Sequence, residues 1–295
     1  MAHEPVLLEE VIRLLDVPRG KIFVDATADG GGHLRAMLKR LSDGGKIIGI
    51  DYDAGMIEKL GREFGGDKRV IFINGNFRDI GNLLAEYAGM VDGILYDLGF
   101  SSLQLEESGR GFAFKEDEPL VMTLKKNLEP RDLTAEKIVN DWPEDRLKEI
   151  IRVYGEERFA GRIARRIVEA RRKKRIRRTT ELAEIIQQAV PKNYERGRIH
   201  PATRTFQALR ITVNDELNAL KEGLAEGWKL LAPDGRMAVI SFHSLEDRIV
   251  KNFFRDKKQE GGAELLAKKP IVAMREEISR NPRSRSAKLR AVAKI

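Results

Sequence analysis

Strand patterns and helix patterns alternate through the first hundred residues, and this alternation restricts the chain to a small set of folds. Short apolar runs predict strands at Lys21–Asp25, Lys46–Asp51, Val70–Ile73 and Val91–Asp97. Amphipathic spacing predicts helices at Val6–Leu15, Gly32–Leu41, Ala54–Phe64 and Asp79–Tyr87. A chain with this alternation forms a parallel sheet whose crossover helices pack on both faces.

The alternation stops near Gln104 and resumes about 100 residues later. The intervening sequence is helical and charged, with loops predicted at Gly109–Pro119 and Pro191–Pro201. After it we expect a long helix at Arg204–Leu231, a strand at Arg236–Ser241, a helix at Leu245–Arg255 and an edge strand at Leu289–Ile295. The sequence therefore predicts one α/β domain formed by residues 1–104 and 205–295, interrupted after its fourth strand by a helical insertion, residues 105–204.

Composition excludes several classes of protein. The 295 residues are 42% hydrophobic, enough for a sizeable core, yet no run approaches the roughly 18 apolar residues of a membrane-spanning helix. The segment Met1-Ala2-His3-Glu4-Pro5 lacks the features of a signal peptide. The chain has no Cys, and no two of its His residues have metal-ligand spacing. We therefore expect a cytoplasmic protein with no membrane partner and no metal site.

Positive charge is concentrated in one part of the chain. Residues 150–205 hold 16 Lys or Arg against 6 Asp or Glu, a net charge of +10, whereas the whole chain carries +8. The rest of the chain therefore carries −2. The densest segment is Arg171-Arg172-Lys173-Lys174-Arg175-Ile176-Arg177-Arg178. Such an excess favours a nucleic-acid partner, and the alternative is a solvated helix end.

Three consecutive glycines, Gly30, Gly31 and Gly32, separate the first strand from a helix that opens with His33. Glycine tolerates positive φ and lets a ligand approach the backbone, and a glycine run at this place is typical of nucleotide-binding α/β folds. The alternative is a tight turn without a ligand.

Further candidates follow the other strands, because ligands of open α/β sheets bind at the carboxyl ends of the strands. Asp51 suits the two hydroxyls of a ribose, while Asp53 suits a helix N-cap. Phe77 is either an adenine-stacking residue or a core residue. Asp97 ends the fourth strand before a turn of small residues.

The last strand leads into Ser241-Phe242-His243-Ser244-Leu245-Glu246-Asp247-Arg248. Ser244 and Asp247 have the spacing of a capping box, which leaves His243 as the candidate functional residue there. Neither a G-x-G-x-x-G nor a G-K-[ST] motif is present to hold a pyrophosphate. The set of candidates therefore favours S-adenosylmethionine as cofactor, with a nicotinamide dinucleotide as the alternative.

Several long blocks resemble the small-subunit ribosomal RNA cytosine-N4 methyltransferase family, known as RsmH or MraW, over nearly the whole chain. They are residues 3–8 (HEPVLL), 31–33 (GGH), 97–104 (DLGFSSLQ), 110–112 (RGF), 200–210 (HPATRTFQALR), 241–248 (SFHSLEDR) and 281–286 (NPRSRS).

The resemblance implies a class I, Rossmann-like methyltransferase fold with a helical insertion for RNA recognition. It implies methylation of the N4 amine of a cytosine in the decoding region of 16S ribosomal RNA. The substrate would be the RNA or the assembled small subunit. The sequence leaves the oligomeric state open, with a homodimer as one alternative. By position, the family's cofactor contacts fall on Gly31, Gly32, His33, Asp51, Phe77, Asp97 and Gln104.

The catalytic group is sought among residues near the strand ends, because the target amine shares its lone pair with the ring and needs an acceptor for an N–H. Asp97 is the candidate, with Ser101, Ser102 or His243 as possible assistants. The chain departs from the family at Asp29, where the family has glycine, and at residues 121–125 (VMTLK), where it has Asp-Met-Arg-Met-Asp. A catalytically weak RNA-binding paralogue and a nicotinamide-dependent oxidoreductase stay open as alternatives.

Overall fold

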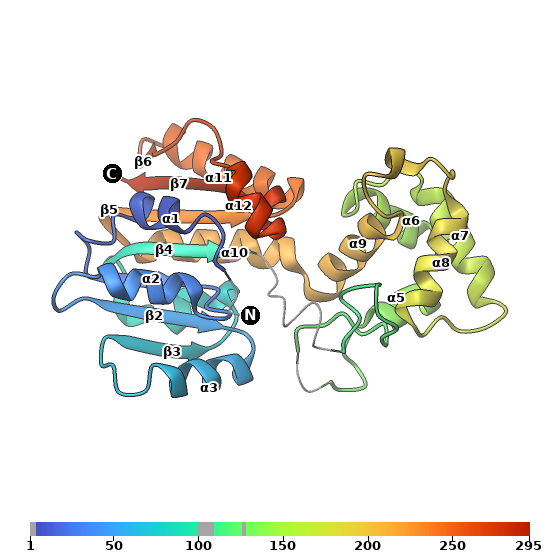
Figure 1. Ribbon diagram of the computed structural model, residues 1–295, viewed down its shortest axis with the longest axis horizontal. Helices are drawn as coiled ribbons and strands as arrows, with labels where there is room; N and C mark the ends of the chain where they lie inside the picture. The colour runs from blue at the N-terminus through green and yellow to red at the C-terminus, as the bar shows by residue number, and fades with distance from the viewer. Residues whose placement is uncertain (1–3, 99–108, 126–127) are drawn as a thin grey trace. The chain divides into compact units, whose positions relative to one another are not determined.

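A single seven-stranded sheet organises the α/β part of the fold in the computed structural model (Figure 1), which describes residues 4–98, 109–125 and 128–295. The strands are β1 (Ile22–Asp25), β2 (Lys46–Asp51), β3 (Val70–Asn74), β4 (Val91–Asp97), β5 (Leu231–Ser241), β6 (Ala263–Leu265) and β7 (Lys288–Lys294). Their spatial order is β3-β2-β1-β4-β5-β7-β6.

The directions of the strands agree in part with the predicted parallel sheet. The pairs β1–β2, β2–β3, β1–β4 and β4–β5 are parallel, as crossover connections require. The last strand, β7, runs antiparallel between β5 and β6. The strand predicted at Leu289–Ile295 forms as β7, but its predicted position at the edge is wrong, because the three-residue β6, too short to leave a sequence pattern, covers its outer side.

Two apolar layers enclose the sheet. Successive residues of β1 point to opposite faces. Phe23 therefore packs with the helices at Leu8–Leu15 and Gly32–Arg40, and Val24 packs with those at Glu216–Leu230 and Ser244–Gln259. The helices and short 3-10 turns of this part are α1 (Leu8–Leu15), α2 (Gly32–Arg40), α3 (Ala54–Glu63), η1 (Phe77–Asp79), α4 (Ile80–Leu83), η2 (Ala85–Tyr87), α10 (Glu216–Leu230), α11 (Ser244–Gln259), α12 (Arg275–Arg280) and η5 (Pro282–Ser286). This architecture confirms the predicted Rossmann-like α/β fold.

Two predicted helices are divided in the structure. The segment predicted as one helix, Asp79–Tyr87, forms η1, α4 and η2, because Leu84 leaves helical geometry with φ −122°. The long helix predicted at Arg204–Leu231 is two helices, α9 (Ala202–Asn214) and α10. Asp215 separates them in the left-handed conformation, with φ 51°, which Asp adopts more readily than most residues.

The intervening sequence is helical, as predicted. Its helices are α5 (Ala135–Asp141), α6 (Glu144–Val153), α7 (Ala160–Arg171), α8 (Thr179–Ala189) and α9, with the 3-10 turn η4 (Tyr194–Gly197). Apolar residues on one side of each helix are buried, among them Ile151 of α6, Ile167 of α7 and Ile186 of α8.

The chain forms two compact units. Unit 1 holds the described residues of Met1–Ser101 and Leu217–Ile295, and unit 2 holds those of Ser102–Glu216. The expected boundary at residues 204–205 lies inside α9, which packs against α5, α6 and α8 and therefore belongs to unit 2 as a whole. The insertion in the structure thus extends twelve residues beyond the expected 105–204.

Candidate functional site

The order of the strands marks one end of β1 as the place for a ligand. The chain proceeds from β1 outward to β3 on one side and then returns to β4 on the other side. In open α/β sheets, ligands bind beyond the carboxyl ends of the strands at such a switch point. Asp25 of β1 and Asp97 of β4 lie at these ends, and both belong to unit 1.

Backbone conformation and packing explain why glycines occupy the β1–α2 loop. Gly31 is the N-cap of α2 with φ 72°, a left-handed conformation that glycine adopts without strain. A Cβ on Gly32 would lie 3.1 Å from the ring of Pro5, so this glycine makes room for the N-terminal segment. Asp29 has φ 40°, in the left-handed region that glycine adopts more readily than other residues.

Asp51 is held at the end of β2 by two backbone N–H donors. Its Oδ2 accepts the N–H of Asp29 and its Oδ1 accepts the N–H of Asp53, both at 2.8 Å. The side chain is 8% exposed, and burial raises its pKa to about 6 against the effect of these hydrogen bonds. Each carboxylate oxygen keeps a further acceptor site, which suits two ribose hydroxyls. Asp53 caps α3, as the sequence predicted, by accepting the N–H of Gly55.

A buried histidine lies between the ends of β1 and β4. Nε2 of His33 is 3.5 Å from Oδ2 of Asp97, and within the described residues neither ring nitrogen makes a hydrogen bond. Burial raises the pKa of Asp25 to about 7, and a charge on His33 opposes this shift. Thr27 joins the loop to β4, since its Oγ1 accepts the N–H of Asp97 at 2.7 Å.

The structure thus brings five of the predicted residues to one edge of the sheet: Gly31, Gly32, His33, Asp51 and Asp97. Phe77 lies after β3, half-buried, with its ring edge-on to Tyr96 at 5.8 Å and against Gly223. These contacts make it at least in part a core residue. Gln104, Ser101 and Ser102 lie outside the residues that the structure describes.

Sequence reasoning gave no role to Asp25 or Thr27. Asp25 looked like the ordinary last residue of a strand, and only its burial at 1% exposure sets it apart. Thr27 leaves no motif because its role depends on the neighbouring strand β4. A charged residue directly after an apolar run was the one signal available.

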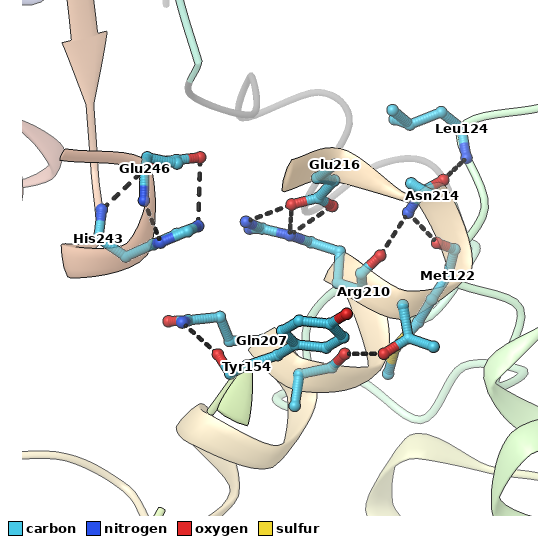
Figure 2. A network of polar contacts seen from close by, with 11 residues as sticks. Met122, Leu124, Tyr154, Gln207, Arg210, Asn214, Glu216, His243 and Glu246 are labelled. Carbon is cyan, nitrogen blue, oxygen red and sulfur yellow. Dashed lines mark hydrogen bonds and ion pairs between the residues drawn. The ribbon is translucent and has the colours of Figure 1, made fainter. Parts of the chain in front are cut away.

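The capping box at α11 differs from the predicted one. Nδ1 of His243 accepts the N–H of Glu246 at 3.4 Å, and Oε2 of Glu246 accepts the N–H of His243 at 3.3 Å (Figure 2). The same Oε2 accepts the N–H of Phe242 at 2.8 Å. Nε2 of His243 lies 3.2 Å from Oε1 of the same glutamate. Asp247, predicted to cap the helix with Ser244, instead pairs with Arg290 of β7 at 2.6 Å. His243 therefore has a structural role at the end of β5.

In unit 2, the segment that departs from the family, residues 121–125, is held through its backbone. The Asn214 side chain donates to the carbonyl of Met122 at 2.8 Å and accepts the N–H of Leu124 at 2.9 Å (Figure 2). Arg110 donates to the carbonyl of Leu124 at 3.0 Å. Side chains of the segment also take part, since Oγ1 of Thr123 accepts the N–H of Lys125 at 3.2 Å and Lys125 pairs with Asp132 at 2.9 Å.

Half of the side chains of the predicted basic segment, residues 171–178, make hydrogen bonds or ion pairs within unit 2. Arg171 donates to the carbonyl of Val139 at 2.8 Å, and the other pairs are Lys174 with Glu181, Arg175 with Asp141 and Arg178 with Asp117. Arg172, Lys173 and Arg177 are exposed, and among the described residues none of them is seen in an ion pair. These three cations, hereafter the free basic triplet, are available to a polyanion.

Comparison with known proteins agrees with the whole-chain resemblance. The sequence profile of the MraW methylase family matches residues 1–295. The chain is 48% identical over 295 residues to the ribosomal RNA small subunit methyltransferase H of Persephonella marina, covering 99% of both chains. It is 46% identical over 310 residues to the protein of that name from Syntrophotalea carbinolica, covering 99% of this chain and 98% of the relative.

Within the described ranges, every helix is too short or too polar to span a membrane.

Proposed function

The chain belongs to the MraW methylase family, and from this premise we propose that it transfers a methyl group from S-adenosylmethionine to the N4 amine of a cytosine in small-subunit (16S) ribosomal RNA. The named relatives support the RNA substrate, and family membership favours methyl transfer over the nicotinamide-dependent oxidoreductase that the strand-end pattern left open. The decoding region is the expected location of the cytosine.

The observation that supports this proposal is the convergence of Asp25, His33, Asp51 and Asp97 at the switch point of the sheet. The residues fit the cofactor. Asp51 offers two acceptor sites for ribose hydroxyls, and His33 has buried ring nitrogens without a hydrogen bond among the described residues. S-adenosylmethionine supplies an electrophilic methyl group on a sulfonium when bound.

The chain's own residues must orient the amine and accept a proton. The cytosine amine is a weak nucleophile because its lone pair is delocalised into the ring, so an acceptor for one N–H increases electron density on nitrogen as the new bond forms. We propose Asp97 for this role, because it ends β4 beside the candidate cofactor residues. Thr27 holds the backbone of Asp97, which limits movement of the carboxylate. The other proposed cofactor contacts are Gly31, Gly32, Phe77 and Gln104.

Unit 2 is proposed to bind RNA. The free basic triplet offers cations for phosphate contacts, which dominate the affinity of proteins for nucleic acid. A cytosine inside a duplex is inaccessible to the strand ends of unit 1, so we expect a single-stranded or flipped base as substrate.

Methyl transfer from labelled S-adenosylmethionine tests the proposal. Purified small subunits and naked 16S RNA are incubated with the protein, and the nucleosides are then separated. N4-methylcytidine in the parent reaction and its loss with Asp97→Asn are the expected results. A catalytically weak paralogue would bind both substrates and give no labelled nucleoside, and label on another nucleoside would overturn the assigned target.

The proposal includes a cytoplasmic location, the assembled small subunit as a partner and a homodimer as the form in solution. Sedimentation velocity of the purified chain tests the dimer, and comparison of small subunits with naked RNA as methyl acceptors tests the ribosomal partner.

A further inference from the structure

Three aromatic rings form a column that leads from the core of unit 2 to its surface. Phe206 of α9 is 4% exposed and meets the half-buried Phe114 edge-on, with 5.0 Å between ring centroids. His200 stacks on Phe114 with 4.7 Å between centroids and 28° between planes. His200 is exposed, so the column ends in an accessible ring.

A hydrogen bond orients the outer ring. Nδ1 of His200 accepts the N–H of Ala202 at 3.2 Å, at the start of α9. The proton of the neutral ring is therefore on Nε2, at the opposite edge of the ring. The orientation of the exposed ring is thus set by one stacking contact and one hydrogen bond before any ligand arrives.

The loop that carries His200 is anchored at its base. Tyr194 is 3% exposed and its hydroxyl donates to the buried carboxylate of Glu157. Glu195 pairs with Arg204 at 3.3 Å, and Arg204 also donates to the carbonyl of Glu156 at 2.9 Å. These contacts hold the loop while its remaining side chains face solvent.

Three positively charged residues are close in sequence to His200 or Phe114. Lys192 and Arg196 lie in the same loop, and Lys115 follows Phe114 directly. All three are exposed, and the described residues show no ion pair for any of them. Arg196 has φ 53°, next to Glu195 at 46°, so the anchored turn holds two non-glycine residues in a left-handed conformation. Proteins bind single-stranded RNA through such a combination: the exposed ring stacks on a base, and the neighbouring cations contact phosphates.

We propose that His200, seated on Phe114, is a stacking platform for an unpaired nucleobase of the RNA substrate, with Lys192 and Arg196 contacting the flanking phosphates. The inference rests on the proposed RNA substrate and deepens it, because it assigns a base-binding position in unit 2. The base extends the column as a fourth ring, and the platform distinguishes single-stranded RNA from a duplex, whose bases are already stacked.

Two substitutions distinguish the contribution of the His200 ring to binding from that of its hydrogen bond. His200→Asn removes the ring and keeps an acceptor for the N–H of Ala202. His200→Phe keeps a stacking ring and removes the acceptor. Gln187→Ala, at an exposed position on α8 whose side chain makes no hydrogen bond in the described structure, is the control. Circular dichroism and thermal unfolding establish that each variant is folded.

The measurement is binding of the full-length variants to a single-stranded oligoribonucleotide that carries 2-aminopurine, whose fluorescence is quenched by stacking. We expect His200→Asn to bind about tenfold more weakly, within the roughly 5- to 150-fold range for loss of one stacked base, and to lose quenching. His200→Phe and Gln187→Ala should stay within about twofold of the parent. If His200→Phe is the weak variant and His200→Asn is unchanged, the hydrogen bond matters and the platform is wrong.

Salt dependence separates stacking from phosphate binding. His200→Asn should leave the slope of log affinity against log salt unchanged, whereas the double change of Lys192 and Arg196 to Ala should reduce its magnitude by about 0.7 for each phosphate that is no longer neutralised. Equal affinity of all His200 variants would overturn the platform even if the parent methylates ribosomal RNA. Absence of methyl transfer by a parent that quenches the probe would overturn the proposed function and leave the platform standing.

Discussion

Individual carboxylates at the strand ends have pKa values that differ from those of exposed acids, and this difference has measurable consequences. Asp25 and Asp51 are both less than a tenth exposed, and burial raises both pKa values. A buried carboxyl that must ionise to bind a ligand makes binding depend on pH near neutrality.

We expect the affinity for S-adenosylmethionine to depend on the ionisation of Asp51. Its pKa is raised to about 6, so the carboxylate proposed to accept both ribose hydroxyls is present above that pH and is lost below it. Affinity should fall about tenfold between pH 7.5 and pH 5. Calorimetric titration across this range checks the expectation.

Asp51→Asn is the control for this profile. It should bind the cofactor more weakly at pH 7.5 by about 1.5–3 kcal/mol, the scale of a hydrogen bond to a charged group, and show a flatter pH dependence. A folded variant with unchanged affinity would remove Asp51 from the site.

Asp25 should affect stability with the opposite pH dependence to a salt-bridged acid. Its pKa of about 7 in the folded state exceeds the ordinary 3.8, so the folded protein binds the extra proton between these values. Stability should therefore fall as pH rises from about 4 to 7. Asp25→Asn should raise the unfolding temperature at pH 8, where the parent must bury a charge, and much less at pH 4.5. An equal effect at both pH values would contradict this account.

Asp29 carries two costs that a glycine would avoid. It has a left-handed backbone, with φ 40°, and its charge raises the pKa of Asp51. We expect Asp29→Gly to tighten cofactor binding several-fold, since a like charge near the cofactor carboxylate costs about 1 kcal/mol at roughly 4 Å even in water. Asp29→Asn should recover part of this gain and lower the pH midpoint of binding.

Weaker binding by both Asp29 variants would show instead that this carboxylate contacts the ammonium group of the cofactor. Calorimetric titration of the two variants at pH 7.5 distinguishes these outcomes.

Among the larger elements, the connection between α7 and α8 has a structural role and a proposed role in RNA binding. Arg171 and Arg175 fasten it to α5, through Val139 and Asp141, and Ile176 is buried beneath it. Only the free basic triplet is left for a partner. A substitution of the whole segment would therefore confuse loss of structure with loss of RNA binding.

Changing the free basic triplet, Arg172, Lys173 and Arg177, to Ala should weaken RNA binding and leave unfolding unchanged. The slope of log affinity against log salt should decrease in magnitude by about 0.7 for each phosphate that the variant fails to neutralise. Exposed Lys39, Lys59 and Lys68 of unit 1 provide a control with the same change of charge. If both triple variants give the same slope, the segment is a solvated surface.

Across the molecule as a whole, the two proposed binding activities belong to different compact units. The free-triplet variant should retain the cofactor affinity of the parent, and Asp51→Asn should retain its RNA affinity. Separate titrations with cofactor and with a single-stranded oligoribonucleotide check this independence. A change of RNA affinity in Asp51→Asn of more than about threefold would show that the two sites are coupled.

Local sequence patterns were sufficient to predict the alternating half of the fold and most candidate residues. The strands β1 to β4 each contain an apolar run, and Gly31 and Asp53 act within their own turns. The position of Asp51 at a strand end predicted its role, whereas the resemblance to a family added His33 as a cofactor contact.

Features that depend on residues far apart in the chain became visible only in the folded structure. Asp215 breaks a continuous helical pattern, and β7 lies inside the sheet because β6 pairs with it. Burial, which no sequence pattern states, raises the pKa of Asp25. Contacts with other segments leave three free cations in the basic segment. Phe114 meets His200 across 86 positions of sequence only because unit 2 folds. Periodicity encodes which face of an element is buried, whereas the partner of each side chain depends on contacts between elements.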